Sequence, residues 1–495
     1  MTAPMPAASR TRHQPRLPMA PAAPLEPKGP RPIHHAGARD ETAGGVDQLL
    51  DRRLAGLAAT DVGNAERFVA RHAHQVRYCH TWGRWLLWDG TRWKRDDTEA
   101  VLSLATDTVR GIYREAATRA TDRDVLAKHA MHSERAERLS AMLRLARSHD
   151  PVATTAAAFD TDPWLLNAAN GTLNLATGAF QHHDPTDLLT LRTDVAFDAA
   201  ATCPRWERFV AEVLVDPEVV AYVRQLFSYT LTGTVTDQSV FLLYGDGANG
   251  KSTLLKVLLA LAGEYGRQAA PDLLMAQRRD THPTVLADLE GARPVVASEV
   301  EEGSRLNEQR AKELAGGEQV TARRMRQDNH SFTPTHTLLL AVNHLPDIRG
   351  RDHGIWRRIR PIGFPTRIDP GRRDPRLYDK LAAELPGILN WALAGLDAWR
   401  DTGELTPPTA VVKAAQGYRA DTDPIAGFIS DACQLDPAAR TPARDLYDAY
   451  LAWHRLHGDV QPLSGRAFGQ ALGRRGLTKT KSGIIYWNGI RPTTR

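Results

Sequence analysis

The sequence predicts an α/β fold with a mostly parallel sheet, and three observations predict it. Short apolar runs at 240–244, 294–298 and 336–342 have the length and composition of buried strands. Helical stretches lie between these runs, and strands that alternate with helices favour a parallel sheet. The first run leads into a glycine-rich loop and then into an apolar helical segment, an order that is typical of phosphate-binding α/β proteins.

Length and composition limit the class of protein. A chain of 495 residues with 42% hydrophobic residues is expected to form two to four globular domains. The three cysteines, Cys79, Cys203 and Cys433, are far apart, which argues against a zinc ribbon or a disulfide framework and suits a reducing cytoplasm. Neither a secretory signal nor an apolar run of the roughly 20 residues that span a bilayer is present, so we expect a cytoplasmic protein with no membrane partner.

The first half of the chain divides into two predicted segments. Residues 1–45 are rich in proline and alanine with interspersed arginine, which predicts a disordered, mildly basic tail. Residues 46–235 are expected to form an α+β domain. It contains an aromatic hairpin turned at Asp89-Gly90, a second hairpin turned at Asn170-Gly171, and helices at 65–74, 96–149 and 204–228.

The second half divides in the same way. Residues 236–405 hold the predicted parallel sheet and a helical extension at 375–400. Residues 406–495 are expected to form a small C-terminal domain. In it Ser464 caps a helix at 465–475, and a hairpin at 478–490 carries Lys479 and Lys481. A helix followed by a basic hairpin suits contact with DNA, although the same aromatic residues would also suit a small packing domain.

The glycine-rich loop fits the pattern G-x-x-x-x-G-K-[ST] of a phosphate-binding P-loop. Glycines allow backbone N–H groups to surround a phosphate, and the following helix adds its positive end. Lys251 is expected to reach the β- and γ-phosphates and Ser252 to bind Mg²⁺. The cofactors are therefore predicted to be ATP and Mg²⁺, and the predicted binding residues are Gly245, Asp246, Gly247, Ala248, Asn249, Gly250, Lys251, Ser252 and Thr253.

Two polar residues follow the other predicted strands. Glu299 ends the run 294–298 and is expected, at the tip of a neighbouring strand, to polarise the attacking water or hold Mg²⁺. Glu301 follows closely and is an alternative for the same role. Asn343 ends the run 336–342, at the sheet edge where a γ-phosphate sensor belongs.

Basic residues surround the third strand. An arginine in 354–360 is predicted to act as an arginine finger on the nucleotide of a neighbouring subunit. Residues 319–336 are expected to form a hairpin turned near 327–330 that grips the DNA backbone electrostatically. Its basic residues are Arg323, Arg324, Arg326 and His330.

In this order, the motifs resemble those of superfamily 3 helicases. The resemblance is closer to the helicase half of phage and plasmid primase–helicases, a group shared with satellite phages and poxviruses. It rests on four stretches, 245–252, 295–299, 312–323 and 343–346, the last taken together with Trp356-Arg357-Arg358. Residues 166–187, with Cys203-Pro204-Arg205-Trp206, are similar to the domain that precedes the helicase in this group, and 481–490 look like its terminal winged-helix hairpin.

The resemblance implies a P-loop ATPase core that is preceded by an α+β domain and followed by a winged-helix domain. It implies that the catalytic residues are Lys251, Glu299, Asn343 and Arg358, with Arg358 as the arginine finger. It also implies that Ser252 and Glu299 bind the metal ion. Lys312 would lie in the motif that links the nucleotide to the DNA hairpin. One departure is that Ser298 stands where many members have a second acid.

The function that the resemblance implies is an ATP-dependent DNA helicase of phage or plasmid replication. Such a protein is expected to be a homo-hexameric ring that moves 3′ to 5′ on single-stranded and forked DNA in the cytoplasm of a bacterial host. Only a short tail precedes residue 46, so we expect a stand-alone helicase that relies on a separate primase or polymerase. The alternative is a DNA-binding replication initiator or loader for which ATP is an assembly switch.

Overall fold

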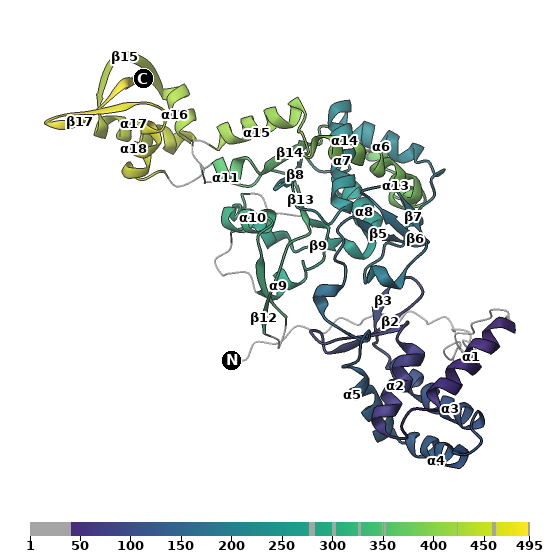
Figure 1. The fold of residues 1–495 in the computed structure, drawn as a ribbon. Coiled ribbons are helices and arrows are strands. Elements are labelled where there is room, and N and C mark those ends of the chain that lie inside the picture. Colours follow the sequence, from purple (N-terminus) through teal and green to yellow (C-terminus); the bar gives the residue numbers. More distant parts are fainter. Residues whose placement is uncertain are drawn as a thin grey trace, which may run out of the picture.

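The computed structural model describes residues 41–276, 283–298, 303–324, 328–348, 350, 353–422, 424–457 and 462–493. The chain is a mixed α/β protein, with N-terminal helices at one end and a C-terminal unit of helices and a long hairpin at the other (Figure 1). Helix α1, Glu41–Leu54, begins before the expected start of order near residue 46, and the rest of the predicted tail lies outside the described residues. Within these ranges, every helix is too short or too polar to cross a membrane.

The N-terminal unit packs helices against a small sheet of order β3-β2-β1-β4. The predicted aromatic hairpin is confirmed, because Trp88 pairs with Trp93 across the Asp89-Gly90 turn. A buried ion pair between Arg67 and Glu115, 2.7 Å long, joins two of the helices. The elements are α2 Asp61–His72, β1 Val76–Cys79, β2 Arg84–Trp88, β3 Trp93–Arg95, α3 Ala100–Ala117, α4 Arg123–Ser133, α5 Ala136–Ala146 and β4 Ala153–Thr154.

A second small sheet, β5-β6-β7, precedes two helices. The second predicted hairpin forms, but Ala168 pairs with Gly171, so its turn residues are Ala169 and Asn170, one position earlier than expected. Gly171 belongs to the strand, where an added Cβ would lie 2.4 Å from the Gln181 carbonyl oxygen. The elements are β5 Leu165–Ala168, β6 Gly171–Asn174, β7 Phe180–Gln181, α6 Pro204–Leu214 and α7 Pro217–Leu231.

The central sheet is parallel throughout, as predicted, and has the order β14-β8-β13-β10-β9. Strand β13 lies between β8 and β10, so the expectation that the acid-bearing strand neighbours the loop-bearing strand is wrong. The sequence analysis also missed both edge strands, β9 and β14. The strands are β8 Val240–Tyr244, β9 Arg267–Gln268, β10 Pro294–Ser298, β13 Thr337–Val342 and β14 Ile359–Gly363.

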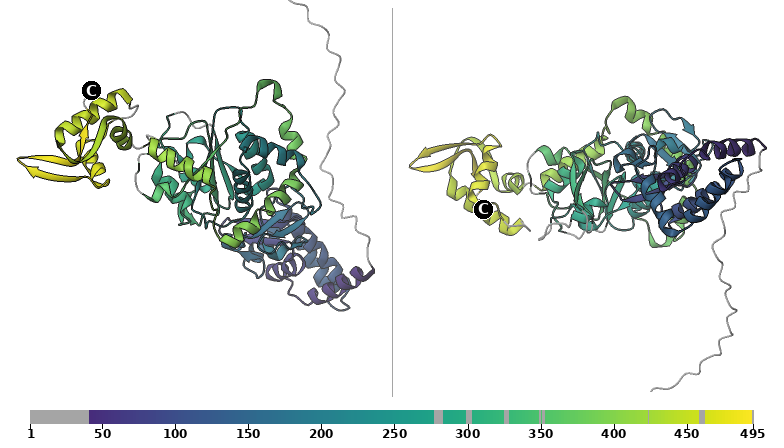
Figure 2. Two further views of the ribbon diagram at one scale, coloured as in Figure 1. Left: turned by 90° about the horizontal axis from the view of Figure 1, so that it is seen from above. Right: turned by 60° about the horizontal axis from the view of Figure 1, so that its bottom comes forward.

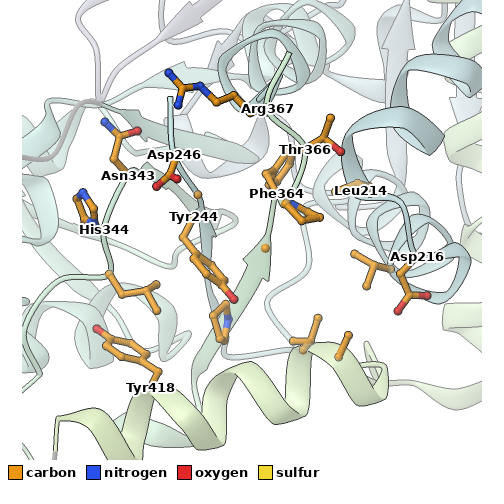
Figure 3. Close-up of a pocket in the computed structure, with 18 of the residues that line it drawn as sticks. Leu214, Asp216, Tyr244, Asp246, Asn343, His344, Phe364, Thr366, Arg367 and Tyr418 are labelled. Atoms are coloured by element: carbon orange, nitrogen blue, oxygen red, sulfur yellow. The ribbon is translucent and has the colours of Figure 1, made fainter. Parts of the chain in front are cut away.

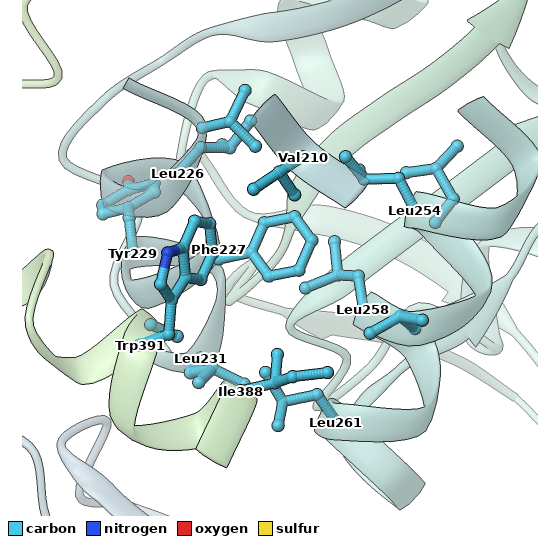
Figure 4. Close-up of a cluster of buried hydrophobic side chains, with 14 of the residues drawn as sticks. Val210, Leu226, Phe227, Tyr229, Leu231, Leu254, Leu258, Leu261, Ile388 and Trp391 are labelled. Carbon is cyan, nitrogen blue, oxygen red and sulfur yellow. The ribbon is translucent and has the colours of Figure 1, made fainter. Parts of the chain in front are cut away.

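Helices on one face of this sheet form its largest hydrophobic core. Phe227 of α7, Leu258 of α8 (Lys251–Ala262) and Trp391 of α13 (Leu385–Leu393) meet there (Figure 4). Phe227 and Trp391 pack edge to face with ring centroids 5.7 Å apart. This core unites residues from both sides of position 235, the boundary expected from the sequence. The other helices here are α12 Leu377–Ala382, α14 Leu396–Thr402 and α15 Thr409–Asp421.

The predicted basic hairpin is present beside the sheet. Strands β11 (Val320–Arg323) and β12 (Asn329–Phe332) are antiparallel, and Arg323 pairs with Asn329. The turn is therefore at 324–328 rather than near 327–330, and His330 lies within β12. Helix α9 (Pro283–Ala287) packs against β11, and α10 (Glu308–Ala315) packs against α11 (His353–Trp356).

The C-terminal unit has a hydrophobic core of its own that begins at Ile425. Ser464 caps α18 as predicted, accepting from the Ala467 N–H at 3.3 Å, and the basic hairpin β16–β17 projects away from the sheet (Figure 2). Helix α15, grouped with this unit in the sequence analysis, instead packs on the central sheet through Tyr418. The elements are α16 Pro424–Ala432, β15 Cys433–Pro442, α17 Ala443–His457, α18 Gly465–Gly473, β16 Thr478–Ser482 and β17 Ile484–Pro492.

A buried arginine joins these layers at the amino-terminal edge of the sheet. The Arg293 guanidinium donates to the carbonyl oxygens of Leu165, at 2.7 Å, and Leu231, and lies 4.1 Å from the centre of the Tyr265 ring. Its backbone N–H donates to the Tyr265 carbonyl, and its own carbonyl accepts from Thr337. Burial lowers the pKa of Arg293, while Tyr265 and Asp160 oppose that shift.

We expect Arg293→Met to lower the free energy of unfolding by about 3 kcal/mol. The substitution leaves two buried carbonyl groups without a hydrogen-bond donor, and each such group costs about 1–3 kcal/mol. The measurement is the thermal unfolding midpoint. Arg84→Met is the control, since Arg84 is exposed and its 3.6 Å ion pair with Asp97 contributes at most about 1 kcal/mol. Equal midpoints for the two variants would contradict the structural role of Arg293.

Candidate nucleotide-binding site

The loop after β8 has a backbone that requires glycine. Gly250 has φ +90°, and an added Cβ would lie 2.7 Å from Val213 and 3.1 Å from Phe209, both on α6. Helix α6 therefore packs directly against the loop and fixes its path. Gly250 is also the N-cap of α8 and offers no side chain to its first turn, where the Lys251 N–H donates to Asn249 Oδ1 at 3.5 Å.

Lys251 lies inside this loop. Its side chain is almost fully buried, and its ammonium donates to the Gly245 carbonyl and, at 3.1 Å, to Asn249 Oδ1. Burial lowers the pKa of Lys251, while the charge of Asp246 opposes the shift. Within the described part of the chain, the buried Asn249 amide nitrogen has no hydrogen-bond partner. A charged donor and an unused donor beside a glycine cradle fit the phosphate oxygens of a nucleotide.

The next residues of α8 complete the predicted motif. Ser252 is exposed in the first turn and Thr253 is half-buried. Ser252 Oγ is thus accessible at the mouth of the loop, as a metal ligand must be. Its assignment to Mg²⁺ stays a prediction, as does that of ATP.

A cavity of about 710 Å³ opens beside the loop (Figure 3). Asn343 and His344, both exposed at the tip of β13, line it together with Gly245 and Asp246. The structure therefore brings the predicted sensor Asn343 to the predicted loop, as the parallel pairing of β13 with β8 requires. The other walls come from the α6–α7 junction, the end of β14 and helix α15; they include Leu214, Asp216, Phe364, Thr366, Arg367 and Tyr418.

Sequence reasoning missed three residues of this cavity. Arg367 follows β14 and supplies a cation near the loop (Figure 3). Phe364 is buried, and its N–H donates to the Tyr244 carbonyl at 2.9 Å. Tyr418 donates to the Pro346 carbonyl and packs edge to face on Trp356, and burial raises its pKa. No local motif marks these residues, since only the pairing of β14 with β8 and the packing of α15 bring them to the site.

The predicted acid cannot be placed, because Glu299 lies outside the described residues, as does Glu301. The strand that leads to it ends at the expected edge. Ser298 pairs with Ala341, and Val342 pairs with Tyr244, so the carboxyl ends of β10, β13 and β8 are level. Ser298 Oγ accepts from the Gln268 amide at 3.4 Å.

Arg358 lies at the opposite end of the sheet from the loop. Its carbonyl accepts from the Val240 N–H at 2.7 Å, at the start of β8, whereas the loop follows the end of that strand. A strand of this length separates them by roughly 15 Å. The Arg358 guanidinium donates to Gly354 O at 2.7 Å and to Gln238 Oε1 at 2.9 Å. Arg358 therefore does not join Lys251 in the same subunit.

Two basic residues of the β11–β12 hairpin contact an acidic residue of the same chain. Arg324 forms a 2.7 Å ion pair with Glu290, and His330 Nε2 lies 3.2 Å from the same carboxylate. Arg323 is exposed at the end of β11, and Lys312 is half-buried on α10. Arg326 lies outside the described residues. Contact of these residues with DNA stays a prediction.

The two lysines of the C-terminal hairpin β16–β17 differ in their surroundings. Lys479 Nζ lies 4.6 Å from the centre of the Trp487 ring, so it is held against the hydrophobic core of that unit. Lys481 is exposed nearer the tip of the hairpin, beside the Gly483 turn. Arg440 covers the ring of Tyr486 at 4.1 Å on the same sheet. The hairpin thus presents the exposed Lys481 near its turn, while Lys479 lies against the core residue Trp487.

Comparison with known protein families gives three matches. Residues 65–215 match a family described as D5 N terminal like, residues 243–358 a family of unknown function (DUF5906), and residues 420–479 a family described as Poxvirus D5 protein-like. The second match spans the glycine-rich loop, Asn343 and Arg358. The matches follow one another along the chain without overlap.

Curated relatives come from large DNA viruses. The "Putative helicase L207/L206" of Acanthamoeba polyphaga mimivirus is 26% identical over 321 residues, which cover 60% of this chain and 33% of that protein. The "Putative primase C962R" of African swine fever virus, strain Badajoz 1971 Vero-adapted, is 25% identical over 334 residues, which cover 61% and 34%. The chain thus spans about a third of the length of these relatives. These matches support a D5-like primase–helicase family.

A solved structure aligns with most of the chain. The apo structure of the NrS-1 C-terminal region covers 84% of this chain and 96% of its own, with a TM-score of 0.47 and 11% sequence identity.

We expect Gly250→Ala to distort the loop, because alanine at positive φ is strained by about 1–2 kcal/mol and its Cβ meets Val213. Gly247→Ala is the matched control in the same loop, since an added Cβ there meets nothing within 4 Å. The measurement is the rise in melting temperature on adding ATP. Gly250→Ala should lose that rise and Gly247→Ala should keep it; a normal rise in both would contradict the geometry given for the loop.

Proposed function

We propose that this chain is an ATP-dependent DNA helicase that acts in DNA replication. The observation that carries the proposal is the arrangement of the central sheet. Gly245 and Asp246 of the glycine-rich loop line one cavity with the tip residue Asn343 at the carboxyl edge, and Lys251 donates to the Gly245 carbonyl, while Arg358 lies at the other edge. The matches to D5-like families and to viral proteins named as helicases and primases support it.

The loop and its neighbours would bind the triphosphate. A bound ATP with Mg²⁺ supplies the phosphoanhydride bond and the divalent charge; Ser252 and Glu299 are the residues that would hold the metal. Lys251 would exchange its bond to the Gly245 carbonyl for phosphate oxygens. Asn343 would orient the attacking water or sense the γ-phosphate, and Glu299 would act as general base. Arg367 adds a cation at the mouth of the cavity.

The rest of the cavity would take the nucleoside. Its walls carry aromatic rings from three elements, namely Tyr244 of β8, Phe364 after β14 and Tyr418 of α15. Asp216, at the α6–α7 junction, offers a carboxylate to a sugar hydroxyl. A volume of about 710 Å³ is within the range of small-molecule sites.

The position of Arg358 favours an assembly of subunits. Because Arg358 is an entire strand away from the loop of its own subunit, a role in hydrolysis requires the nucleotide of a neighbour. A head-to-tail contact of this kind generates a ring of identical subunits when the rotation between neighbours closes. We propose a homo-hexamer that moves 3′ to 5′ along single-stranded DNA.

DNA contacts are proposed on the two hairpins. The β11–β12 hairpin offers Arg323, Arg324 and His330, with Lys312 on the helix before it. Arg326 lies outside the described residues and is proposed for the same contact from the sequence alone. The β16–β17 hairpin of the C-terminal unit, which we propose to be a winged helix, offers Lys481 and Lys479 to forked DNA. Cationic hairpins of this kind bind phosphates without reading sequence.

Lys251→Ala is expected to reduce ATP hydrolysis at least about 100-fold, because the charge that stabilises the transferring phosphoryl group is lost. The measurement is hydrolysis with and without single-stranded DNA at fixed low salt. Lys256→Ala, an exposed lysine on the same helix, is the control and should stay within twofold of wild type. Wild-type hydrolysis that DNA does not stimulate would instead favour the ATP-switched initiator or loader, and near-normal turnover of Lys251→Ala would refute the site.

Arg358→Ala is expected to reduce the rate of ATP hydrolysis about 1,000-fold or more, while ATP binding is retained. Mixing it with Lys251→Ala should recover part of the activity, since some interfaces then combine an intact loop with an intact arginine. Arg444→Ala, an exposed arginine of α17, is the control and should be active alone. Absence of recovery in the mixture would show that Arg358 acts within its own subunit or only structurally.

A further inference from the structure

Gln238, just before β8, contacts three residues from two parts of the central domain. Its Oε1 accepts from Arg358 Nη2 at 2.9 Å and from Arg357 Nη2 at 3.1 Å. Its amide nitrogen donates to the Gly316 carbonyl at 2.8 Å. These partners fix the orientation of the amide, because arginines only donate and a carbonyl only accepts. One half-buried side chain therefore joins the arginine pair to the end of α10.

The Gly316 partner is a constrained position. Gly316 ends α10, and an added Cβ would lie 2.6 Å from the Lys312 carbonyl oxygen. Gly317 follows with φ +74°, and the chain then enters β11 of the basic hairpin. The turn that Gln238 holds is thus the link between Lys312 and Arg323.

The arginine partners are equally constrained. Arg358 is bonded through its backbone to Val240, two residues after Gln238, and its side chain also donates to Gly354. Arg357 is exposed, and its guanidinium donates to Gln238 just before β8. A shift of the pair toward a neighbouring subunit would therefore act on Gln238 and, through its amide, on Gly316.

We propose that Gln238 is a positioning residue that couples the Arg357–Arg358 pair to the α10–β11 turn. Its amide makes both contacts at once, so the arginine pair and the turn adopt linked positions. The role of this coupling rests on the proposed function. In that function, Gln238 would relate contact of the arginine pair with a neighbour's nucleotide to the position of the DNA-binding hairpin. The contacts themselves are independent of that function.

The test is a double-mutant cycle read by amide hydrogen exchange on the full chain. The variants are Arg358→Ala, Gln238→Met and the double variant, and the segments followed are 316–323 and 354–360. Methionine matches the length of glutamine but makes neither contact. Arg358→Ala should increase exchange at 316–323 by about fivefold in the wild-type background, a size typical of coupling between sites, and should add nothing in the Gln238→Met background.

Two further variants separate coupling from general destabilisation. Gln238→Glu keeps an acceptor for the arginines but places a carboxylate against the Gly316 carbonyl, so exchange should rise at 316–323 and not at 354–360. Gln416→Met, an exposed glutamine of α15 that lines a groove with Arg357, is the matched control and should change neither segment. A response of 316–323 to Arg358→Ala that is absent, or equal in both backgrounds, would overturn the proposal.

A second readout tests the purpose of the coupling. Gln238→Glu should lower the stimulation of ATP hydrolysis by single-stranded DNA about fivefold relative to Gln416→Met. Unchanged stimulation would overturn the link to the DNA hairpin even if the exchange cycle succeeds. A wild-type protein without ATP hydrolysis would refute the proposed function alone, because the exchange cycle requires neither ATP nor DNA.

Discussion

The buried guanidinium of Arg293 is the constraint on which the arrangement of the chain depends. It joins the β5 strand, the end of α7, the Tyr265 ring and the start of β10 at one edge of the central sheet. A charged group buried this deeply is tolerated only where its donors meet carbonyl oxygens, and Arg293 meets two. The amino-terminal edge is thereby locked to the preceding domain, which leaves the carboxyl edge to form the cavity.

Because the central strands are parallel, the glycine-rich loop and the arginine pair lie at opposite edges of the sheet. The carboxyl ends of β8 and β13 place the loop that carries Lys251 and the tip residue Asn343 at one edge, while the pairing of β14 with β8 holds Arg358 at the other end. Within one subunit, the glycine-rich loop and Arg358 therefore lie at opposite edges of the sheet. Gln238 lies at the arginine end, and its amide contacts both Arg358 and the segment that leads to the basic hairpin.

Local patterns in the sequence predict much of this structure. The apolar runs give three of the central strands, the glycine spacing gives the loop, and Asp89-Gly90 gives its hairpin. Strand β14 was missed because Arg360 and Pro361 obscure its apolar pattern, and an edge strand tolerates proline. Strand order, and with it the place of Arg367 and Tyr418 in the cavity, depends on contacts between distant segments that no local pattern encodes.

The pairing of Glu290 with Arg324 and His330 bears on how the hairpin would meet DNA. Both partners of the Arg324 ion pair are about one-third exposed, so solvent screens it and its worth is at most about 1 kcal/mol. A phosphate oxygen offers Arg324 a comparable or stronger charge-assisted hydrogen bond. Exchange of Glu290 for a phosphate therefore costs little, and the carboxylate would hold the hairpin in place without preventing DNA binding. The same weak competition favours contacts that form and break repeatedly, as movement along a strand requires.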